Sequence, residues 1–245
     1  MRGEFNGGNV MNSSFFAELI GTMILVLLGD GVVANVILKK TKGANGGIIA
    51  ITSGWAFAVA IPVFMFGNVS GAHFNPAVTL ALASIGKFSW LDVPMYLIAQ
   101  FIGAFIGALL VLISYYDHFK LTEDKSIKLG VFCTAPEVRN LKLNFATEFI
   151  GTFILMFAIL GIGSYPLADG ISPIAVGIIV WGIGLSLGGP TGYAINPARD
   201  LGPRFAHFIL PVPNKGNSDW QYALIPIIAP ICGAIVSAFT YSMIF

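Results

Sequence analysis

Long apolar stretches alternate with short polar segments along the chain, and this pattern predicts membrane-spanning helices. A helix needs about 20 predominantly apolar residues to cross the hydrocarbon core of a bilayer. Six stretches approach this length, separated by polar segments such as KKTKGANG and PVPNKGNSD. The predicted spans are Phe15 to Leu38, Gly47 to Phe66, Val93 to Tyr115, Phe145 to Ser164, Pro173 to Leu187 and Tyr222 to Phe245.

Two further apolar segments are too short to span, and each carries Asn-Pro-Ala near its start. Asn is favoured as a helix cap and Pro at the first helical position, so both segments predict helix starts. A helix of about eleven residues rises roughly 16 Å, half of the hydrocarbon thickness. The starts are therefore expected deep in the membrane, beside protein or a wet cavity. The two segments run from Phe74 to Ile85 and from Ile195 to Ile209.

An internal repeat links the two halves of the chain. The segment AELIGTMILVLLG begins at Ala17 and TEFIGTFILMFAILG begins at Thr147, so Glu18 corresponds to Glu148. Each half then continues with a second span, an Asn-Pro-Ala segment and a third span. Because three is an odd number of crossings, the second copy must enter the membrane from the opposite face. We expect inverted repeats over about 14–115 and 144–245, joined by a loop at 116–143.

This inversion has an electrostatic consequence. The two short helices approach from opposite sides, and both N-termini point at the midplane. Each N-terminus carries roughly half an elementary positive charge. A cation, including a proton in transit, therefore meets a barrier there, whereas a neutral molecule does not. We expect residues 1–245 to form a single transmembrane domain.

The composition agrees with a membrane protein. Hydrophobic residues make up 56% of the 245 residues and charged residues 10%, against roughly 25% charged in soluble domains. The net charge of +1 gives no sign of a nucleic-acid partner. Cys133 lies in a polar connection and Cys232 in an apolar run, so we expect neither a disulfide nor a metal site. The opening MRGEFNGGNV has no apolar stretch of its own, so we expect no cleavable signal peptide.

The two Asn-Pro-Ala segments carry a family resemblance. SGAHFNPAVTLAL and GYAINPARDLGPR resemble the two signature loops of the aquaporin superfamily, and the likeness covers nearly the whole chain. It implies an all-α membrane protein with six transmembrane helices and two re-entrant half-helices. It also implies a passive channel that is not an enzyme and needs no cofactor. The signature residues are Asn75, Pro76, Ala77, Asn196, Pro197 and Ala198.

Further positions resemble the glycerol-conducting branch of that superfamily. Asp200 follows Asn-Pro-Ala-Arg, where water-selective members usually have a small residue, and IPIIAPICGA points the same way. Water-selective members have His at the position of Gly184. Tyr193 departs from the pattern, because the best-known glycerol facilitator has Phe there. Counting without gaps from the signatures, the resemblance places a selectivity filter on Trp55, Gly184, Tyr193 and Arg199.

The resemblance also implies how such a filter conducts. Trp55 and Tyr193 would form an apolar wall, Gly184 would leave room, and Arg199 would donate hydrogen bonds to solute hydroxyls. The amides of the two signature asparagines would donate to each passing oxygen and interrupt proton relay. The acceptors along the path would be the carbonyls of Gly71, Ala72, His73, Gly192, Tyr193 and Ala194.

Charged and titratable groups outside the filter are given supporting roles. Glu18 and Glu148 are costly inside spans, and we expect them to accept backbone N–H groups of the loops before the short helices. The His73 side chain is expected to make a structural hydrogen bond. The stretch from Asp117 to Lys142 is interpreted as a solvated loop that can contain a short helix, and not as a binding motif. Interfacial or loop positions are expected for Asp30, Lys39, Lys40 and Lys42.

Several alternatives stay open. The favoured solute is glycerol, with water, but a channel of the same fold could prefer lactic acid, urea or water. A secondary transporter would need coupling groups, and Glu18 and Glu148 are the candidates. An intramembrane hydrolase built on Ser70 and His73 lacks a third orienting group.

The resemblance implies a homotetramer in the plasma membrane, surrounded by lipid, with both termini cytoplasmic. This orientation leaves Arg2 and Lys87 on the cytoplasmic side and the other eleven of 13 Lys and Arg residues on the outer half. The positive-inside rule predicts the reverse. The sequence therefore gives two conflicting indications of orientation.

Overall fold

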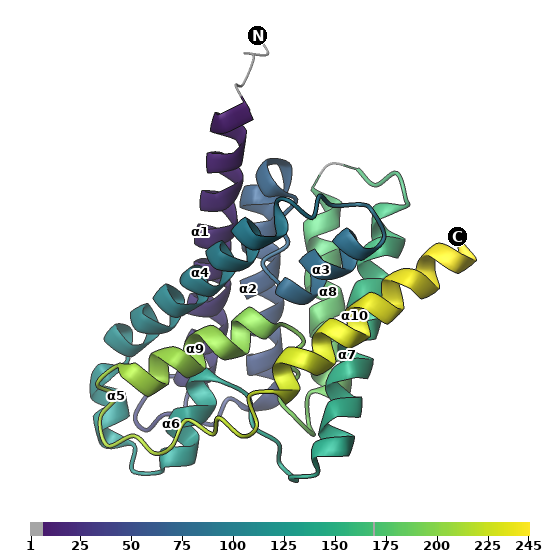
Figure 1. Ribbon diagram of the computed structural model, residues 1–245. Helices are drawn as coiled ribbons and strands as arrows, with labels where there is room; N and C mark the ends of the chain where they lie inside the picture. Colours follow the sequence, from purple (N-terminus) through teal and green to yellow (C-terminus); the bar gives the residue numbers. More distant parts are fainter. Residues whose placement is uncertain (1–6, 169) are drawn as a thin grey trace.

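The computed structural model describes residues 7–168 and 170–245, and all regular elements in that part of the chain are helices. Figure 1 shows their arrangement. They are α1 (Gly7–Ile37), α2 (Gly47–Ser70), α3 (Pro76–Ser84), α4 (Val93–Ser114), α5 (Tyr116–Leu121), α6 (Lys125–Phe132), α7 (Leu141–Gly163), α8 (Ile171–Leu187), α9 (Pro197–Ile209) and α10 (Ile225–Ile244).

The six predicted spans correspond to α1, α2, α4, α7, α8 and α10. All except α8 are long and apolar enough to cross a membrane on their own, whereas α8 is an apolar helix of 17 residues. The ends of the helices differ by a few residues from the predicted ends where local capping decides them. Helix α7 begins four residues before Phe145 because the Asn140 side chain accepts a hydrogen bond from the Leu143 backbone N–H. Helix α2 continues to Ser70 and stops where Gly71 takes a left-handed φ of 82°.

The connection between the two halves is not the solvated loop predicted for Asp117 to Lys142. It forms the short helices α5 and α6, and α6 packs against α1 and α9. Phe119 and Phe132 are fully buried there. Lys128 is also buried, and its Nζ donates to the Pro213 carbonyl at 2.6 Å. The apolar residues within this charged stretch account for the difference, because they cover one end of the bundle.

Glycines let the long helices approach closely. A Cβ added to Gly103 would lie 2.2 Å from the Leu19 carbonyl oxygen, so α4 fits against α1 only with glycine there. A Cβ added to Gly233 would lie 2.3 Å from the Phe149 carbonyl oxygen, which gives α10 the same contact with α7. These small residues bring the backbones together as in other membrane helix pairs.

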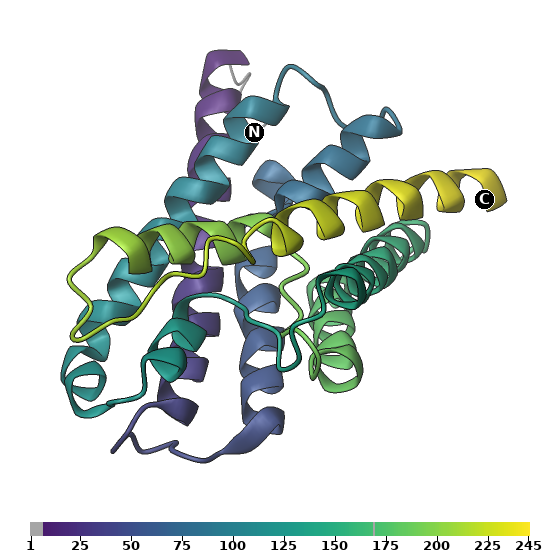
Figure 2. The same ribbon diagram turned by 60° about the horizontal axis from the view of Figure 1, so that its bottom comes forward.

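The two short helices α3 and α9 start beside each other in the middle of the molecule and run in opposite directions (Figures 1 and 2). Helix α3 packs on α10, and α9 packs on α4. Neither start is exposed to the surroundings, because Asn75 and Asn196 are both buried. Long helices thus enclose two helix N-termini at the centre of the bundle.

Candidate functional site

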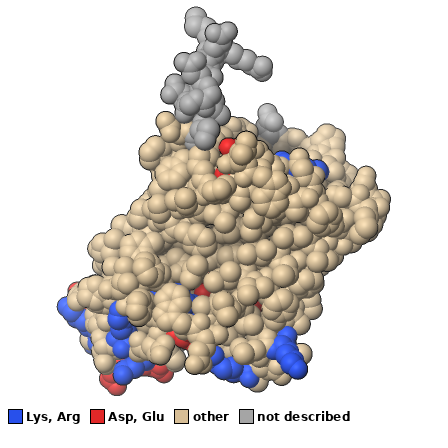
Figure 3. All heavy atoms as spheres, viewed as in Figure 1, with Lys and Arg blue, Asp and Glu red and all other residues tan. Residues whose placement is uncertain are grey.

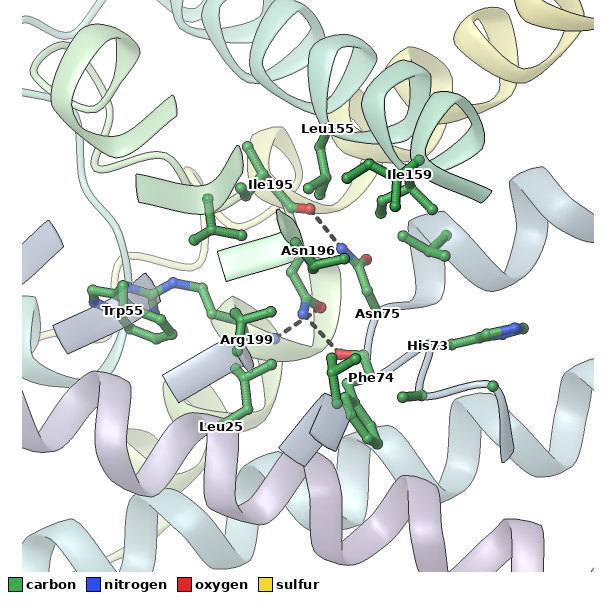
Figure 4. A pocket seen from close by; sticks show the side chains of 18 of the residues that line it. Leu25, Trp55, His73, Phe74, Asn75, Leu155, Ile159, Ile195, Asn196 and Arg199 are labelled. Carbon is green, nitrogen blue, oxygen red and sulfur yellow. Dashed lines mark hydrogen bonds between the residues drawn. The ribbon is translucent and has the colours of Figure 1, made fainter. Parts of the chain in front are cut away.

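Asn75 and Asn196 join the two half-helices at their starts. The Asn75 side-chain oxygen accepts a hydrogen bond from the Ala77 backbone N–H at 2.9 Å, and Asn196 accepts from Ala198 N–H at 3.0 Å. Each side-chain nitrogen donates across the centre, where Asn75 reaches the Ile195 carbonyl and Asn196 the Phe74 carbonyl, both at 2.8 Å (Figure 4). An amide carries two N–H donors, so one on each asparagine is left for another partner.

Two buried glutamates hold the loops that precede the half-helices. Glu18 accepts hydrogen bonds from the backbone N–H groups of His73 at 2.9 Å and Phe74 at 2.8 Å, and from the Ser70 hydroxyl at 2.7 Å. The matching donors to Glu148 are Thr191 Oγ1 at 2.6 Å, Ala194 N at 3.0 Å and Ile195 N at 2.9 Å. Both loops are therefore fixed by a carboxylate behind them.

These loops contain strained backbone. Ala72, Phe74, Tyr193 and Ile195 have φ values of 52°, 49°, 38° and 43°, in the left-handed region that side-chain-bearing residues rarely adopt. Each such residue costs about 1–3 kcal/mol and persists only where the surroundings hold it. The glutamate hydrogen bonds supply that restraint.

The strained loops leave a row of backbone carbonyls free. In the described part of the chain, no hydrogen bond is made to the six carbonyls proposed from the sequence, those of Gly71, Ala72, His73, Gly192, Tyr193 and Ala194. The His73 side chain turns aside, and its Nδ1 lies 3.1 Å from Thr79 Oγ1. Free acceptors inside a membrane protein need partners, because an unsatisfied buried carbonyl is costly.

A cavity of about 400 Å³ runs along these loops. Five of the six carbonyl-bearing residues line it, together with Asn75 and Asn196, whereas Gly192 does not. The rest of the lining is mostly apolar and includes Leu25, Val59, Val63, Val78, Leu82, Leu155, Ile159, Val176 and Val180. The cavity thus combines residues whose backbone carbonyls are free with a large apolar surface.

Three of the four predicted filter residues line the cavity. The guanidinium carbon of Arg199 lies 4.1 Å from the centre of the Trp55 ring, as Figure 4 shows, and Tyr193 lines the same space. Gly184 does not line it. A Cβ on Gly184 would lie 2.9 Å from Tyr193 Cζ, so the missing side chain makes room for the tyrosine ring.

Asp30 is not the interfacial or loop charge predicted from the sequence. It is fully buried on α1, and its Oδ1 lies 3.4 Å from Arg199 Nη1. The prediction was wrong because it grouped Asp30 with the charges that follow the first span, although Asp30 lies inside the predicted span Phe15 to Leu38. The signal that could have found it is a lone carboxylate in the apolar run LLGDGVV, since an ionisable group inside a span is expensive unless it has a partner.

Asp200 lies outside the cavity, in the first turn of α9. It is fully buried, and it accepts hydrogen bonds from Arg204 Nε at 2.8 Å and from the Thr134 backbone N–H at 2.8 Å. Arg204 in turn donates to the Ser218 carbonyl at 2.8 Å. This network ties α9 to the α6–α7 connection at Thr134 and to the α9–α10 connection at Ser218.

Comparison with known proteins identifies the family. A family model described as major intrinsic protein matches residues 9–241. The chain belongs to the major intrinsic protein family. Its members are channels and not enzymes, as the sequence predicted.

Individual relatives place the chain within the family. It is 58% identical to the "Probable glycerol uptake facilitator protein" of Thermotoga maritima over 95% of this chain and 100% of the relative. It is 45% identical to the "D/L-lactic acid transporter" of Lactiplantibacillus plantarum over 93% of this chain and 96% of the relative. The X-ray structure of the aquaglyceroporin from Plasmodium falciparum superposes with a TM-score of 0.85 at 33% identity, covering 94% of this chain and 95% of that one.

These findings confirm three predictions made from the sequence. The chain is an integral multi-pass membrane protein with the all-α aquaporin fold. It resembles the aquaglyceroporin branch of the major intrinsic protein family more than a water-selective channel. Its class of function is transport of small neutral solutes.

Proposed function

We propose that the protein is a passive channel for glycerol and other small neutral solutes, with water, and that it excludes protons and ions. The observation that carries the proposal is a cavity lined both by residues with free backbone carbonyls and by apolar side chains. Glycerol has hydroxyls along one edge and carbons along the other, so it can use both kinds of lining at once. The glycerol uptake facilitator relatives support this choice of solute.

Conduction would use donors and acceptors in sequence along the path. In the filter, Trp55 and Tyr193 contact the carbon edge of the solute while Arg199 donates to its hydroxyls. The carbonyls of the residues that line the cavity accept, namely those of Gly71, Ala72, His73, Tyr193 and Ala194. At the centre, the second N–H of Asn75 and of Asn196 donates to each passing oxygen.

Proton exclusion would follow from the same centre. An oxygen that accepts from both asparagines cannot relay a proton along a file of water molecules. The positive N-terminal ends of α3 and α9 add an electrostatic barrier to cations. A secondary transporter would use Glu18 and Glu148 to bind a coupling ion, but both carboxylates already accept hydrogen bonds from loop N–H groups. We therefore propose passive conduction without a coupling ion.

We infer that the two halves, about 14–115 and 144–245, are inverted repeats joined by 116–143. Matched contacts support this division. A Cβ on Gly21 would meet the Phe74 ring, and a Cβ on Gly151 would meet Ile195, so the residue before each signature asparagine packs against the glycine three places after each glutamate. The family resemblance also supports a homotetramer in the plasma membrane with cytoplasmic termini.

Lactic acid in its neutral form is a second candidate solute. The lactic acid transporter of Lactiplantibacillus plantarum is one of the relatives of this chain. The loop after α1 carries Lys39, Lys40 and Lys42, which would concentrate lactate at that mouth.

Light scattering by liposomes that contain the purified protein tests both candidates. Glycerol, urea, lactic acid at acidic pH and an impermeant sugar would be applied in turn. We expect glycerol to give the largest increase in the rate of solute entry over protein-free liposomes. A protein that passes water but excludes glycerol would overturn the proposal. Faster entry of lactic acid than of glycerol would favour the second candidate.

A further inference from the structure

The filter arginine has a buried negative partner behind it. Asp30 is fully buried in α1, and its Oδ1 lies 3.4 Å from Arg199 Nη1, whose side chain is 8% exposed. Within the described residues, Asp30 is the carboxylate that forms an ion pair with Arg199. The other oxygen, Asp30 Oδ2, is buried without a hydrogen-bond partner in that part of the chain.

The residue before Asp30 supports the other side of the filter. A Cβ on Gly29 would lie 2.3 Å from Trp55 Cζ3, so only glycine lets the indole ring lie against α1. Arg199 then lies over that ring, with 4.1 Å from its Cζ to the ring centre. Gly29 and Asp30 therefore hold Trp55 and Arg199 from behind, although neither lines the cavity.

The charges along the path require a compensating group. The N-termini of α3 and α9 and the Arg199 guanidinium are all positive. They repel cations, but an uncompensated positive filter would attract small anions. Glu18 and Glu148 lie behind the half-helix loops and accept N–H groups there. Asp30 is the group in contact with the guanidinium itself.

We propose that Asp30 is a specificity-determining residue that cancels the charge of Arg199, so that the filter rejects anions as well as cations. One N–H of Arg199 is directed at Asp30, and the remaining donors bind neutral hydroxyls. This inference rests on the proposed channel function, and it adds the basis of anion exclusion. The role differs from that of the pore-lining residues, because Asp30 acts through Arg199.

Substitution of Asp30 by Asn keeps the shape and removes the charge. The Asp30→Asn protein would be reconstituted into liposomes, and nitrate entry would be compared with glycerol entry. Valinomycin would carry potassium as the counter-ion, so that charge build-up does not limit nitrate entry. We expect the nitrate-to-glycerol permeability ratio to rise by about tenfold or more. The matched control is Asp117→Asn, at a carboxylate with an 86% exposed side chain on α5, which leaves the ratio unchanged. An unchanged ratio in Asp30→Asn overturns the inference.

A second pair of variants tests the negative charge of Asp30 when Arg199 is absent. In Arg199→Gln, Asp30 is left uncompensated, so the potassium-to-glycerol permeability ratio should rise. Adding Asp30→Asn to that variant should lower the ratio again. Equal potassium ratios in the single and double variants overturn the inference even where Asp30→Asn alone does not fold. Failure of the channel proposal looks different, because the unaltered protein would then pass no glycerol above protein-free liposomes.

Discussion

Asn75 and Asn196 each perform two tasks with one side chain. The oxygen caps a half-helix, and the nitrogen bonds to the loop of the other half. The asparagine that starts α7, Asn140, caps a helix at the exposed surface. Comparing substitutions at Asn196 and at Asn140 therefore separates the effect of losing a helix cap from the effect of losing a donor at the centre of the path.

Asn196→Ala removes a cap and leaves the Phe74 carbonyl without its donor. We expect a loss of about 1–3 kcal/mol in unfolding free energy and a marked fall in glycerol permeability. Asn140→Ala should lose about 1 kcal/mol while glycerol permeability per folded protein stays the same. Thermal unfolding and liposome light scattering measure the two quantities. Equal permeability in both variants would contradict the role of Asn196.

Gly184 provides a second test at the filter. A Cβ there would lie 2.9 Å from Tyr193 Cζ and from Thr52 Cγ2, so Gly184→Ala pushes the tyrosine ring into the path. We expect glycerol permeability to fall by roughly tenfold, with a smaller fall for water, because overpacking shifts side chains by fractions of an ångström. Gly182→Ala on the same helix meets nothing within 4 Å and serves as the control. Unchanged glycerol permeability in Gly184→Ala would count against the filter.

At the scale of elements, the loops before α3 and α9 hold their strained shape through carboxylates. Glu148→Gln replaces one acceptor oxygen by a donor that faces the Thr191 hydroxyl or a backbone N–H. We expect a loss of roughly 1–3 kcal/mol in unfolding free energy. Glu123→Gln, at a side chain 88% exposed, should change it by less than about 1 kcal/mol. Chemical unfolding in detergent compares the two, and similar losses would contradict the assigned support.

The elements that the sequence predicted best are those with a strong local signal. Apolar length located the five long helices and the shorter apolar helix α8, and Asn-Pro located the starts of α3 and α9, because capping is a local property. The repeat pointed to Glu18 and Glu148 in matching places. The sequence allowed a short helix in the stretch that forms α5 and α6 but did not predict its burial, because the apolar residues there become buried only on the assembled bundle.

In the filter, too, the sequence predicted local features better than contacts between distant segments. The filter residues could be placed on Trp55, Gly184, Tyr193 and Arg199 by counting from the signatures. The partner of Arg199 could not be predicted, because Asp30 is 169 positions away along the chain and meets it only when α1 packs beside α9. Likewise, no local pattern shows that the space beside Gly184 is filled by Tyr193.

At the scale of the whole molecule, charge gathers at one end. Figure 3 shows most of the visible Lys and Arg at the end opposite the start of α1. The proposed orientation puts that end outside the cell, against the positive-inside rule. The native Cys133 is buried, so its labelling by a thiol reagent cannot reveal the orientation of the protein in the membrane.

Two exposed lysines at opposite ends can report on orientation, namely Lys42 and Lys87. We expect Lys42→Cys to react with a membrane-impermeant maleimide added outside intact cells, and Lys87→Cys to react only after permeabilisation. The matched pair controls for reactivity, since both sites lie in exposed connections. The reverse pattern would place the termini outside and overturn the orientation.

The central claim is that a path lined by free carbonyls and apolar side chains, with a blocked proton relay, carries glycerol passively. Liposomes holding the protein and an internal pH dye measure glycerol entry and proton entry in the same sample. The account predicts glycerol entry well above protein-free liposomes, independent of any imposed proton gradient, with no added proton leak. Glycerol entry that collapses when the gradient is removed, or that is absent altogether, would contradict it.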